Sequence, residues 1–255
     1  MKRQPALFIG HGSPMNAIED NKFTQNWRSI AKQIPKPEAI LAISAHWYTN
    51  DTKIMDEANP KMVYDMYGFP EELYEVDYKA SGAPEFAHAT KDLVSKSISY
   101  DNSWGYDHGT WSVLHVMYPE ADIPVYQMSV DKNSDGNTHF KIGQEIKSLR
   151  DKGVLILASG NVVHNLSKVN FSMSGGYDWA DEFDDYIKRK IKNREYSDVI
   201  DYKKAGQSSN SAFWTPEHFY PLLYVLGASN EEDHLSIIND SCVMGSMSMT
   251  CYLFE

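Results

Sequence analysis

Short runs of apolar residues recur along the chain and predict its architecture. The runs lie at residues 6–9, 39–47, 123–130 and 154–159. Each is mostly apolar over a length typical of strands, and turn residues or a histidine close most of them, so we predict buried strands covered on both faces. A weaker alternation over residues 246–254 predicts a last strand.

Segments with apolar residues at helical spacing separate these runs. Trp27, Ile30 and Ile34 share one helical face, for example, and Pro35 ends that segment. Helices are expected at residues 23–34, 84–95, 139–152, 178–191 and 215–227, with a shorter one that Pro119 closes. Residues 51–79 are tyrosine-rich and irregular, and predict a strand with a long loop that can cover a site. The polar residues 195–212 predict a surface excursion.

Strands that alternate with helices predict an α/β fold. We expect a central, largely parallel sheet with helices on both faces. Because no linker, repeat or low-complexity segment divides the chain, we expect a single domain over residues 1–255.

Three of the nine histidines stand where predicted strands end. His11 lies between two glycines after the first run, His46 ends the second, and His164 follows the fourth. Parallel strands deliver such residues to one sheet edge, where α/β proteins bind ligands. Neutral imidazoles that converge there favour a divalent transition metal. The glycines beside His11 would let metal and substrate approach the backbone.

Two further histidines are candidates for the same site. His218 lies at the expected start of a helix, whose dipole keeps the ring neutral and able to coordinate. His108 follows Asp107 in a glycine-punctuated loop, a setting that suits proton transfer. A lone histidine is more often structural or exposed, and we assign that status to the remaining four, His88, His115, His139 and His234.

Composition narrows the class of partner. The net charge of −11 argues against nucleic acid and anionic membranes, which need a basic surface. No apolar run is long enough to span a bilayer. The only cysteines, Cys242 and Cys251, have neither metal-ligand nor disulfide spacing, which favours a reducing, cytoplasmic setting. A small-molecule partner is therefore expected, and no oligomeric state is favoured.

Other common catalytic motifs do not match. Gly12-Ser13-Pro14 is no nucleophile elbow, and neither a phosphate-binding loop nor a dinucleotide fingerprint occurs. Trp47, Trp104 and Trp111 lie near the key histidines in sequence, either as core residues or as a flat wall for an aromatic substrate.

Five blocks together resemble the signature of one family. They are Gly-His-Gly-Ser-Pro-Met at residues 10–15, Ser-Ala-His-Trp at 44–47, Trp-Gly-Tyr-Asp-His-Gly-Thr-Trp at 104–111, Ser-Gly-Asn-Val-Val-His-Asn at 159–165 and Pro-Glu-His at 216–218. The chain resembles the 4,5-DOPA extradiol dioxygenases, within the class III extradiol ring-cleavage dioxygenases. The blocks follow the family order over nearly the whole chain.

The resemblance implies a metal-dependent enzyme that opens the ring of a DOPA-like catechol with O2 to give a semialdehyde. One divalent ion per chain would be held by His11, His46 and His218. His164 would be a further ligand or a base beside the metal, and His108 would be the acid or base.

One departure from related class III enzymes bears on which metal is expected. A histidine occupies the place of their carboxylate ligand, and all-histidine ligation suits Zn2+. We therefore expect Zn2+ in the protein as found and Fe2+ to be required for dioxygenase activity. Two alternatives are a zinc hydrolase that uses a metal-activated water and a non-catalytic metal- or catechol-binding protein.

Overall fold

The four apolar runs form adjacent strands at the centre of one sheet. In the computed structural model, which describes residues 2–255, these strands are β1 (Ala6–Gly10), β2 (Ala39–Thr49), β5 (Val125–Asp131) and β6 (Val154–Gly160). They are parallel and lie in the order β5-β2-β6-β1. Every residue of β1, β5 and β6 is buried, as near-continuous apolar strands predict.

Short strands extend this parallel core on both sides. Within residues 2–255, the sheet has eight strands in the order β4-β3-β5-β2-β6-β1-β10-β7. β10 (Cys251–Phe254) pairs antiparallel with β1, and β7 (Leu235–Ile238) pairs antiparallel with β10. β3 (Lys53–Ile54) and β4 (Ser99–Tyr100) form the other edge.

The C-terminal segment departs from the prediction of one strand over residues 246–254. It contains β9 (Met247–Ser248), which pairs with β8 (Cys242–Val243) in a separate two-stranded sheet, and then β10. The sequence pattern also does not reveal β4 or β7. β4 has two residues and β7 has four, so neither is long enough to give a clear strand pattern in the sequence.

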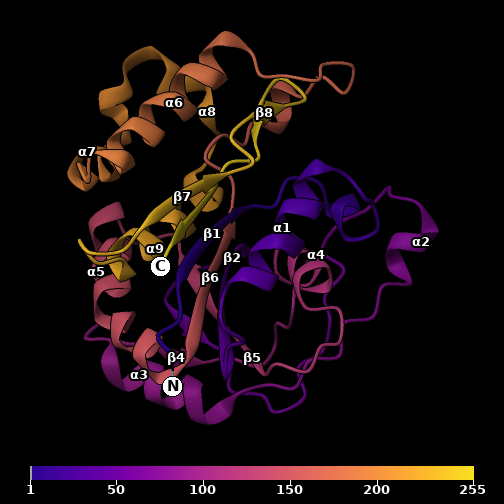
Figure 1. Cartoon of the computed structure of the whole chain (residues 1–255), viewed down its shortest axis with the longest axis vertical. Coiled ribbons are helices and arrows are strands. Elements are labelled where there is room, and N and C mark those ends of the chain that lie inside the picture. The colour runs from indigo at the N-terminus through magenta and orange to yellow at the C-terminus, as the bar shows by residue number, and fades with distance from the viewer. Residues whose placement is uncertain (1) are drawn as a thin grey trace.

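Helices cover both faces of the sheet (Figure 1). α1 (Lys22–Gln33) and α4 (His108–Met117) pack with Leu7 and Ile9 of β1. α3 (Pro84–Leu93), α5 (Gly136–Ile146) and α9 (Tyr220–Ala228) pack with Ala6 and Phe8, on the opposite face. Alternate residues of a strand point to opposite faces, so one strand serves both cores. The predicted α/β fold with a largely parallel central sheet is confirmed.

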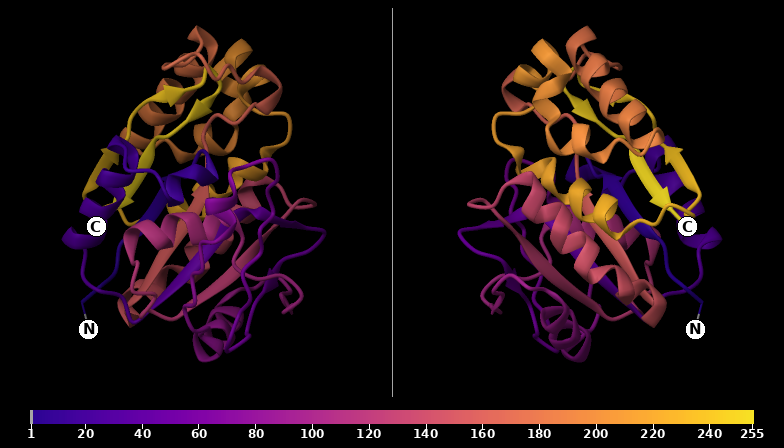
Figure 2. Two further views of the ribbon diagram at one scale, coloured as in Figure 1. Left: turned by 90° about the vertical axis from the view of Figure 1, so that its right-hand side faces the viewer. Right: turned by 90° about the vertical axis from the view of Figure 1, so that its left-hand side faces the viewer.

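A third group of helices lies above the C-terminal edge of the parallel strands (Figures 1 and 2). It consists of α6 (Asp178–Lys192), α7 (Tyr196–Ile200), η4 (Tyr202–Ser208) and α8 (Ser209–Ala212). The prediction of a surface excursion over residues 195–212 misses these helices: most of its residues are at least partly exposed, but Val199, Ser208, Ser209 and Ala212 are buried. A few buried positions among many polar ones are enough to dock these short helices.

Two predicted helices have different bounds in the structure. α5 begins at Gly136, where the Asp135 side chain accepts from Thr138 N, and it ends at Ile146. A 3-10 helix, η2 (Lys147–Lys152), continues it to Gly153, which has φ 82°. The segment expected to start at residue 215 is a 3-10 turn, η5 (Pro216–His218), followed by α9. The remaining short helices are η1 (Pro14–Ala17), α2 (Glu71–Tyr74) and η3 (Leu166–Lys168).

Strand register aligns the ends of the parallel core. Gly10 lies opposite Gly160, and Ser44 lies opposite Ser159. The pairing of β2 with β5 is irregular between Ile43 and Tyr48. Bulges of this kind re-aim side chains, and His46 lies within this one. The aligned strand ends therefore place His11 and His46 at the same edge of the sheet.

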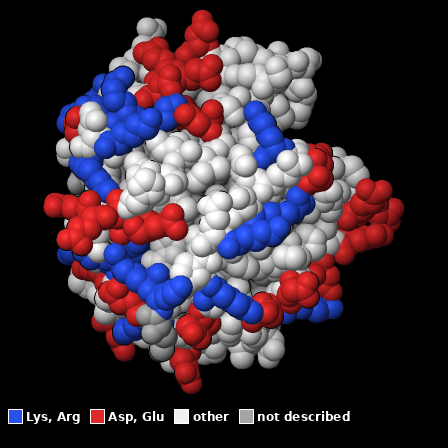
Figure 3. All heavy atoms as spheres, viewed as in Figure 1, with Lys and Arg blue, Asp and Glu red and all other residues white. Residues whose placement is uncertain are grey.

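The surface is mixed in charge. On the face in Figure 3, basic and acidic side chains form small groups of either sign, with uncharged surface between them. Within residues 2–255, no helix has both the length and the apolar character needed to cross a membrane.

Candidate metal centre

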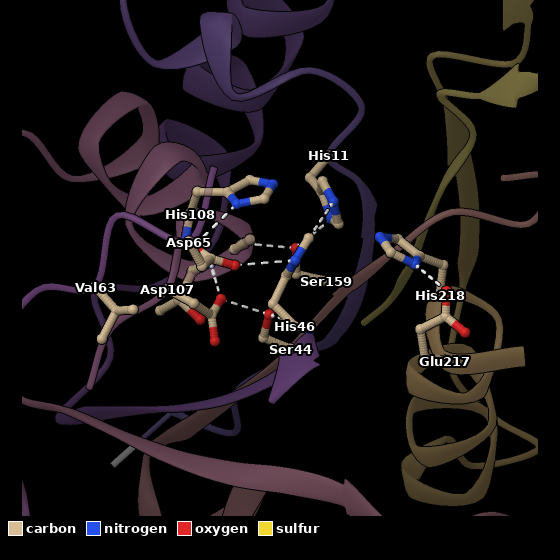
Figure 4. Close-up of polar contacts among 12 residues, drawn as sticks. His11, Ser44, His46, Val63, Asp65, Asp107, His108, Ser159, Glu217 and His218 are labelled. Atoms are coloured by element: carbon tan, nitrogen blue, oxygen red, sulfur yellow. Dashed lines mark hydrogen bonds and ion pairs between the residues drawn. The ribbon is translucent and has the colours of Figure 1, made fainter. Parts of the chain in front are cut away.

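Three imidazoles meet at the C-terminal edge of the parallel strands (Figure 4). His11 follows β1, His46 lies in the bulge of β2, and His218 ends η5. Their ring centroids are 5.0–5.3 Å apart in pairs. Residues from the beginning and the end of the chain therefore form one cluster.

A serine orients the ring of His11. His11 Nδ1 lies 2.9 Å from Ser159 Oγ, and Ser159 Oγ donates to the Gly109 carbonyl oxygen at 2.5 Å. Because the serine hydrogen is used in that bond, Ser159 accepts from His11 Nδ1–H. The lone pair of His11 is therefore on Nε2.

Carboxylates orient the other two rings. His218 Nδ1 lies 3.0 Å from Glu217 Oε1, and His46 Nδ1 lies 3.0 Å from Asp65 Oδ2. An ionised carboxylate only accepts hydrogen bonds, so both rings present Nδ1–H and keep a lone pair on Nε2. His218 Nε2 is buried and has no hydrogen-bond partner among residues 2–255.

This donor set fits a divalent transition metal. His11 Nε2 and His46 Nε2 are 3.2 Å apart, although both carry lone pairs. Two nitrogens bound to one tetrahedral Zn2+ at about 2.0–2.1 Å stand roughly 3.3–3.4 Å apart. One nitrogen from each of His11, His46 and His218 lies within 4.8 Å of the others. Acceptors on the opposite ring nitrogens are typical of metal-ligating histidines.

The electrostatic environment keeps most of the cluster neutral. Burial lowers the pKa of His11 and of His218, and neighbouring histidines lower both further. Burial also acts to lower the pKa of His46, but contact with Asp65 and the charge of Asp107 outweigh it, so the pKa is raised. A metal ion would compete with a proton at His46.

His164 lies beside this cluster, stacked on His218. The two ring centroids are 3.5 Å apart, with an angle of 9° between the planes. Burial, with the nearby His46 and His108, lowers the pKa of His164 to about 3. His164, Glu217 and His218 each place a ligand atom within 4.8 Å of the others, so His164 lies where either a further ligand or a base beside a metal would stand.

His108 is the first residue of α4, so its expected position in a flexible loop is wrong. Asp107 is the N-cap and accepts from Thr110 N at 3.2 Å. The buried carboxylate also accepts from Ser44 Oγ at 2.6 Å, Gln127 Nε2 at 2.6 Å and Trp104 Nε1 at 3.0 Å. His108 is thereby held with its ring centroid 3.8 Å from that of His46. Burial, with the nearby His46, lowers the pKa of His108.

Comparison with known proteins identifies the family. Residues 5–255 match the sequence model of the catalytic LigB subunit of aromatic ring-opening dioxygenase. The chain belongs to this family. It is therefore an extradiol dioxygenase, as the sequence blocks predict.

Named relatives and a solved structure agree with this membership. The chain is 42% identical to a 4,5-DOPA dioxygenase extradiol of Escherichia coli strain K12, over 97% of this chain and 93% of that protein. It is 40% identical to one from Beta vulgaris, over 97% of this chain and 95% of that protein. The crystal structure of an uncharacterized protein from Escherichia coli K12 superposes with a TM-score of 0.88 at 37% identity, over 99% of this chain and 100% of that one.

Three residues orient the clustered histidines, and the sequence did not predict this role for any of them. Asp65 lies in the irregular segment 51–79, where no pattern distinguishes it from neighbouring acidic residues. Ser159 and Glu217 lie within recognised blocks, but their role depends on contacts that only the fold creates. The positions of the histidines along the chain therefore predicted the site, whereas nothing in the sequence marked the residues that orient them.

The glycines around His11 serve packing rather than ligand access. A Cβ on Gly10 would lie 2.6 Å from the backbone carbon of Met249, and one on Gly12 would lie 2.5 Å from Met249 Sδ. Gly12 also has φ 63°, which favours glycine. The space predicted for metal and substrate at these two residues is occupied by Met249.

Two of the three tryptophans are core residues. Trp47 and Trp111 are buried, and Trp111 Nε1 donates to the Val63 carbonyl oxygen at 3.1 Å. Trp104 is half-buried and donates to Asp107. The first two therefore belong to the hydrophobic core, as one of the two predicted alternatives has it.

Proposed function

We propose that this protein holds one divalent metal ion on His11, His46 and His218 and opens the ring of a DOPA-like catechol with O2, giving a semialdehyde. The observation that carries the proposal is the convergence of three Nε2 lone pairs, each turned inward by an acceptor at Nδ1. Membership of the LigB family and relatives named 4,5-DOPA dioxygenase extradiol support the reaction and the substrate class.

The three neutral imidazoles suit either Zn2+ or Fe2+. Bound Fe2+ would supply the electron transfer between catechol and O2 that ring opening needs, whereas Zn2+ has no accessible second oxidation state. We expect Zn2+ in the protein as isolated and Fe2+ to be required for activity.

His108 and His164 are the proposed catalytic residues. They lie on different sides of the cluster, because His108 packs against His46 and His164 stacks on His218. Burial lowers the pKa of both rings, so both are neutral near pH 7 and can accept a proton. One of these two rings would take the second catechol proton and later return that proton to the leaving oxygen.

Oxygen uptake tests the proposal. Protein reconstituted with Fe2+ under anaerobic conditions should consume O2 when catechol or DOPA is added in air-saturated buffer, with a yellow product. The same preparation loaded with Zn2+ is the matched control and should consume none. His218→Ala should lose both iron and activity. Absence of O2 uptake across a panel of catechols, with iron occupancy confirmed, would contradict the proposed function.

A further inference from the structure

One carboxylate touches two of the site's histidines. Asp65 Oδ2 lies 3.0 Å from His46 Nδ1, and Asp65 Oδ1 lies 3.0 Å from His108 Nδ1. Asp65 Oδ1 also accepts from the backbone N–H of His108 at 2.8 Å. The Asp65 side chain is only 11% exposed, and Figure 4 shows it between the two rings. It thus joins a proposed metal ligand to a proposed proton carrier.

The loop that carries Asp65 is held from several sides. Val63 N donates to the Tyr106 carbonyl oxygen at 2.7 Å, and Trp111 Nε1 donates to the Val63 carbonyl oxygen at 3.1 Å. Tyr64 Oη donates to the Val76 carbonyl oxygen at 2.7 Å. Contacts other than those with the histidines therefore fix the backbone around Asp65. A residue that orients other side chains needs such independent support.

An anchored carboxylate dictates which nitrogen of each ring carries hydrogen. Asp65 accepts from the His108 backbone N–H, and an ionised carboxylate only accepts hydrogen bonds. His46 Nδ1 and His108 Nδ1 must then be N–H groups, which leaves both Nε2 atoms free. His108 Nδ1 lies off the hydrogen-bond axis, and such contacts commonly align when a ligand binds.

We propose that Asp65 is a positioning residue that holds both rings as the Nδ1–H tautomer. It would leave His46 Nε2 free for the metal and make His108 Nε2 the atom that exchanges a proton with the substrate. The inference rests on the proposed function for the roles of these two histidines. It means that one carboxylate orients both the proposed metal ligand His46 and the proposed proton carrier His108.

Substitution of Asp65 should affect the two rings unequally. An asparagine offers one acceptor and one donor. The His108 backbone N–H already needs an acceptor on its side, so the amide oxygen should face His108 and the NH2 group should face His46. An NH2 group opposite His46 Nδ1 requires the Nε2–H tautomer, which cannot bind a metal through Nε2.

The test measures Zn2+ affinity and histidine tautomers in the full-length protein. In Asp65→Asn, competition with a chelator should show Zn2+ affinity reduced about 10–100-fold, the range for outer-shell partners. Long-range 1H–15N NMR should show Nδ1–H at His108 in both proteins, but a changed tautomer at His46 in the variant. Asp56→Asn is the matched control, because Asp56 contacts the more exposed His88 at the same 3.0 Å. It should leave both readouts unchanged.

Three outcomes would overturn the inference. Unchanged Zn2+ affinity and tautomers in Asp65→Asn would show that Asp65 orients neither ring. A loss of affinity as complete as in His46→Ala would make Asp65 a ligand. If the variant does not fold, the Zn2+-loaded wild-type protein still decides, since an Nε2–H tautomer at His46 or His108 contradicts the proposal. None of these measurements uses O2 or catechol, so they stand apart from the test of the dioxygenase reaction.

Discussion

Gly160 is the residue whose enlargement should damage the site most directly. It ends β6, and a Cβ at this position would lie 2.1 Å from the His218 carbonyl oxygen. Ordinary contacts of a Cβ begin at 3.4 Å, so Gly160→Ala must separate the two backbones by about 1.3 Å. The clash is with backbone, and His218 O also accepts from Asn161 N at 2.9 Å. No side-chain rotation can relieve it.

The displacement should be transmitted to the His218 ring. Protein interiors are close-packed and pass such strain on, and overpacking of this kind costs about 1–3 kcal/mol of folding free energy. A misplacement of about 1 Å at a reacting group can cost roughly 100-fold in rate. For Gly160→Ala we expect Zn2+ affinity about 10–100-fold lower and Fe2+-dependent O2 uptake about 100-fold slower.

A remote glycine separates this effect from general destabilisation. A Cβ on Gly227 would lie 2.1 Å from the Phe140 carbonyl oxygen, the same clash between α5 and the far end of α9. In urea denaturation both variants should lose similar stability, while chelator competition should show wild-type Zn2+ affinity in Gly227→Ala alone. Wild-type affinity in Gly160→Ala, or equal losses in both variants, would refute the argument.

Two further predictions concern buried charges away from the site. Arg150 is fully buried and donates to Asp233 and to the carbonyl oxygens of Gln4, Ala228 and Phe254. Arg150→Met should therefore cost about 3–5 kcal/mol in urea denaturation, and a loss below about 1 kcal/mol would contradict this account. Burial raises the pKa of Asp184 from 3.8 to about 6, so the folded state binds this proton more tightly than the unfolded chain. The associated stability is full below about pH 4 and is lost as the pH rises through 6. The free energy of unfolding of wild type relative to Asp184→Asn should thus fall by about 2 kcal/mol from pH 4 to pH 7; a pH-independent difference would be inconsistent with a buried, titrating Asp184.

The sequence predicts the parallel core because burial on both faces leaves a plain signal. Apolar runs such as residues 154–159 need no knowledge of their neighbours to be recognised as buried strands. The antiparallel additions β7 and β10 were harder, because their partners are chosen by the tertiary fold. The helices of residues 195–212 were missed for the same reason, since a few buried residues dock them.

The candidate site divides in the same way. His11 and His46 could be proposed from strand ends, because parallel strands bring their C-terminal ends together whatever else the chain does. His164 also arrives there, but its stacking on His218 depends on the bond from His164 N to the Ala212 carbonyl oxygen, within a segment predicted to be surface. Position along the sheet was predictable, whereas ring orientation was not.

Orientation nevertheless decides whether three histidines make a metal site. Their lone pairs must meet at one point to within about 0.5 Å, and each ring can rotate unless its other nitrogen is held. Ser159 of β6 holds a ring that follows β1, and Asp65 of a long loop holds a ring of β2. Only Glu217 adjoins its histidine in sequence. The site therefore requires correct packing between segments far apart in the chain, so substitutions at the acceptors should weaken metal binding while the fold and all three proposed ligands remain.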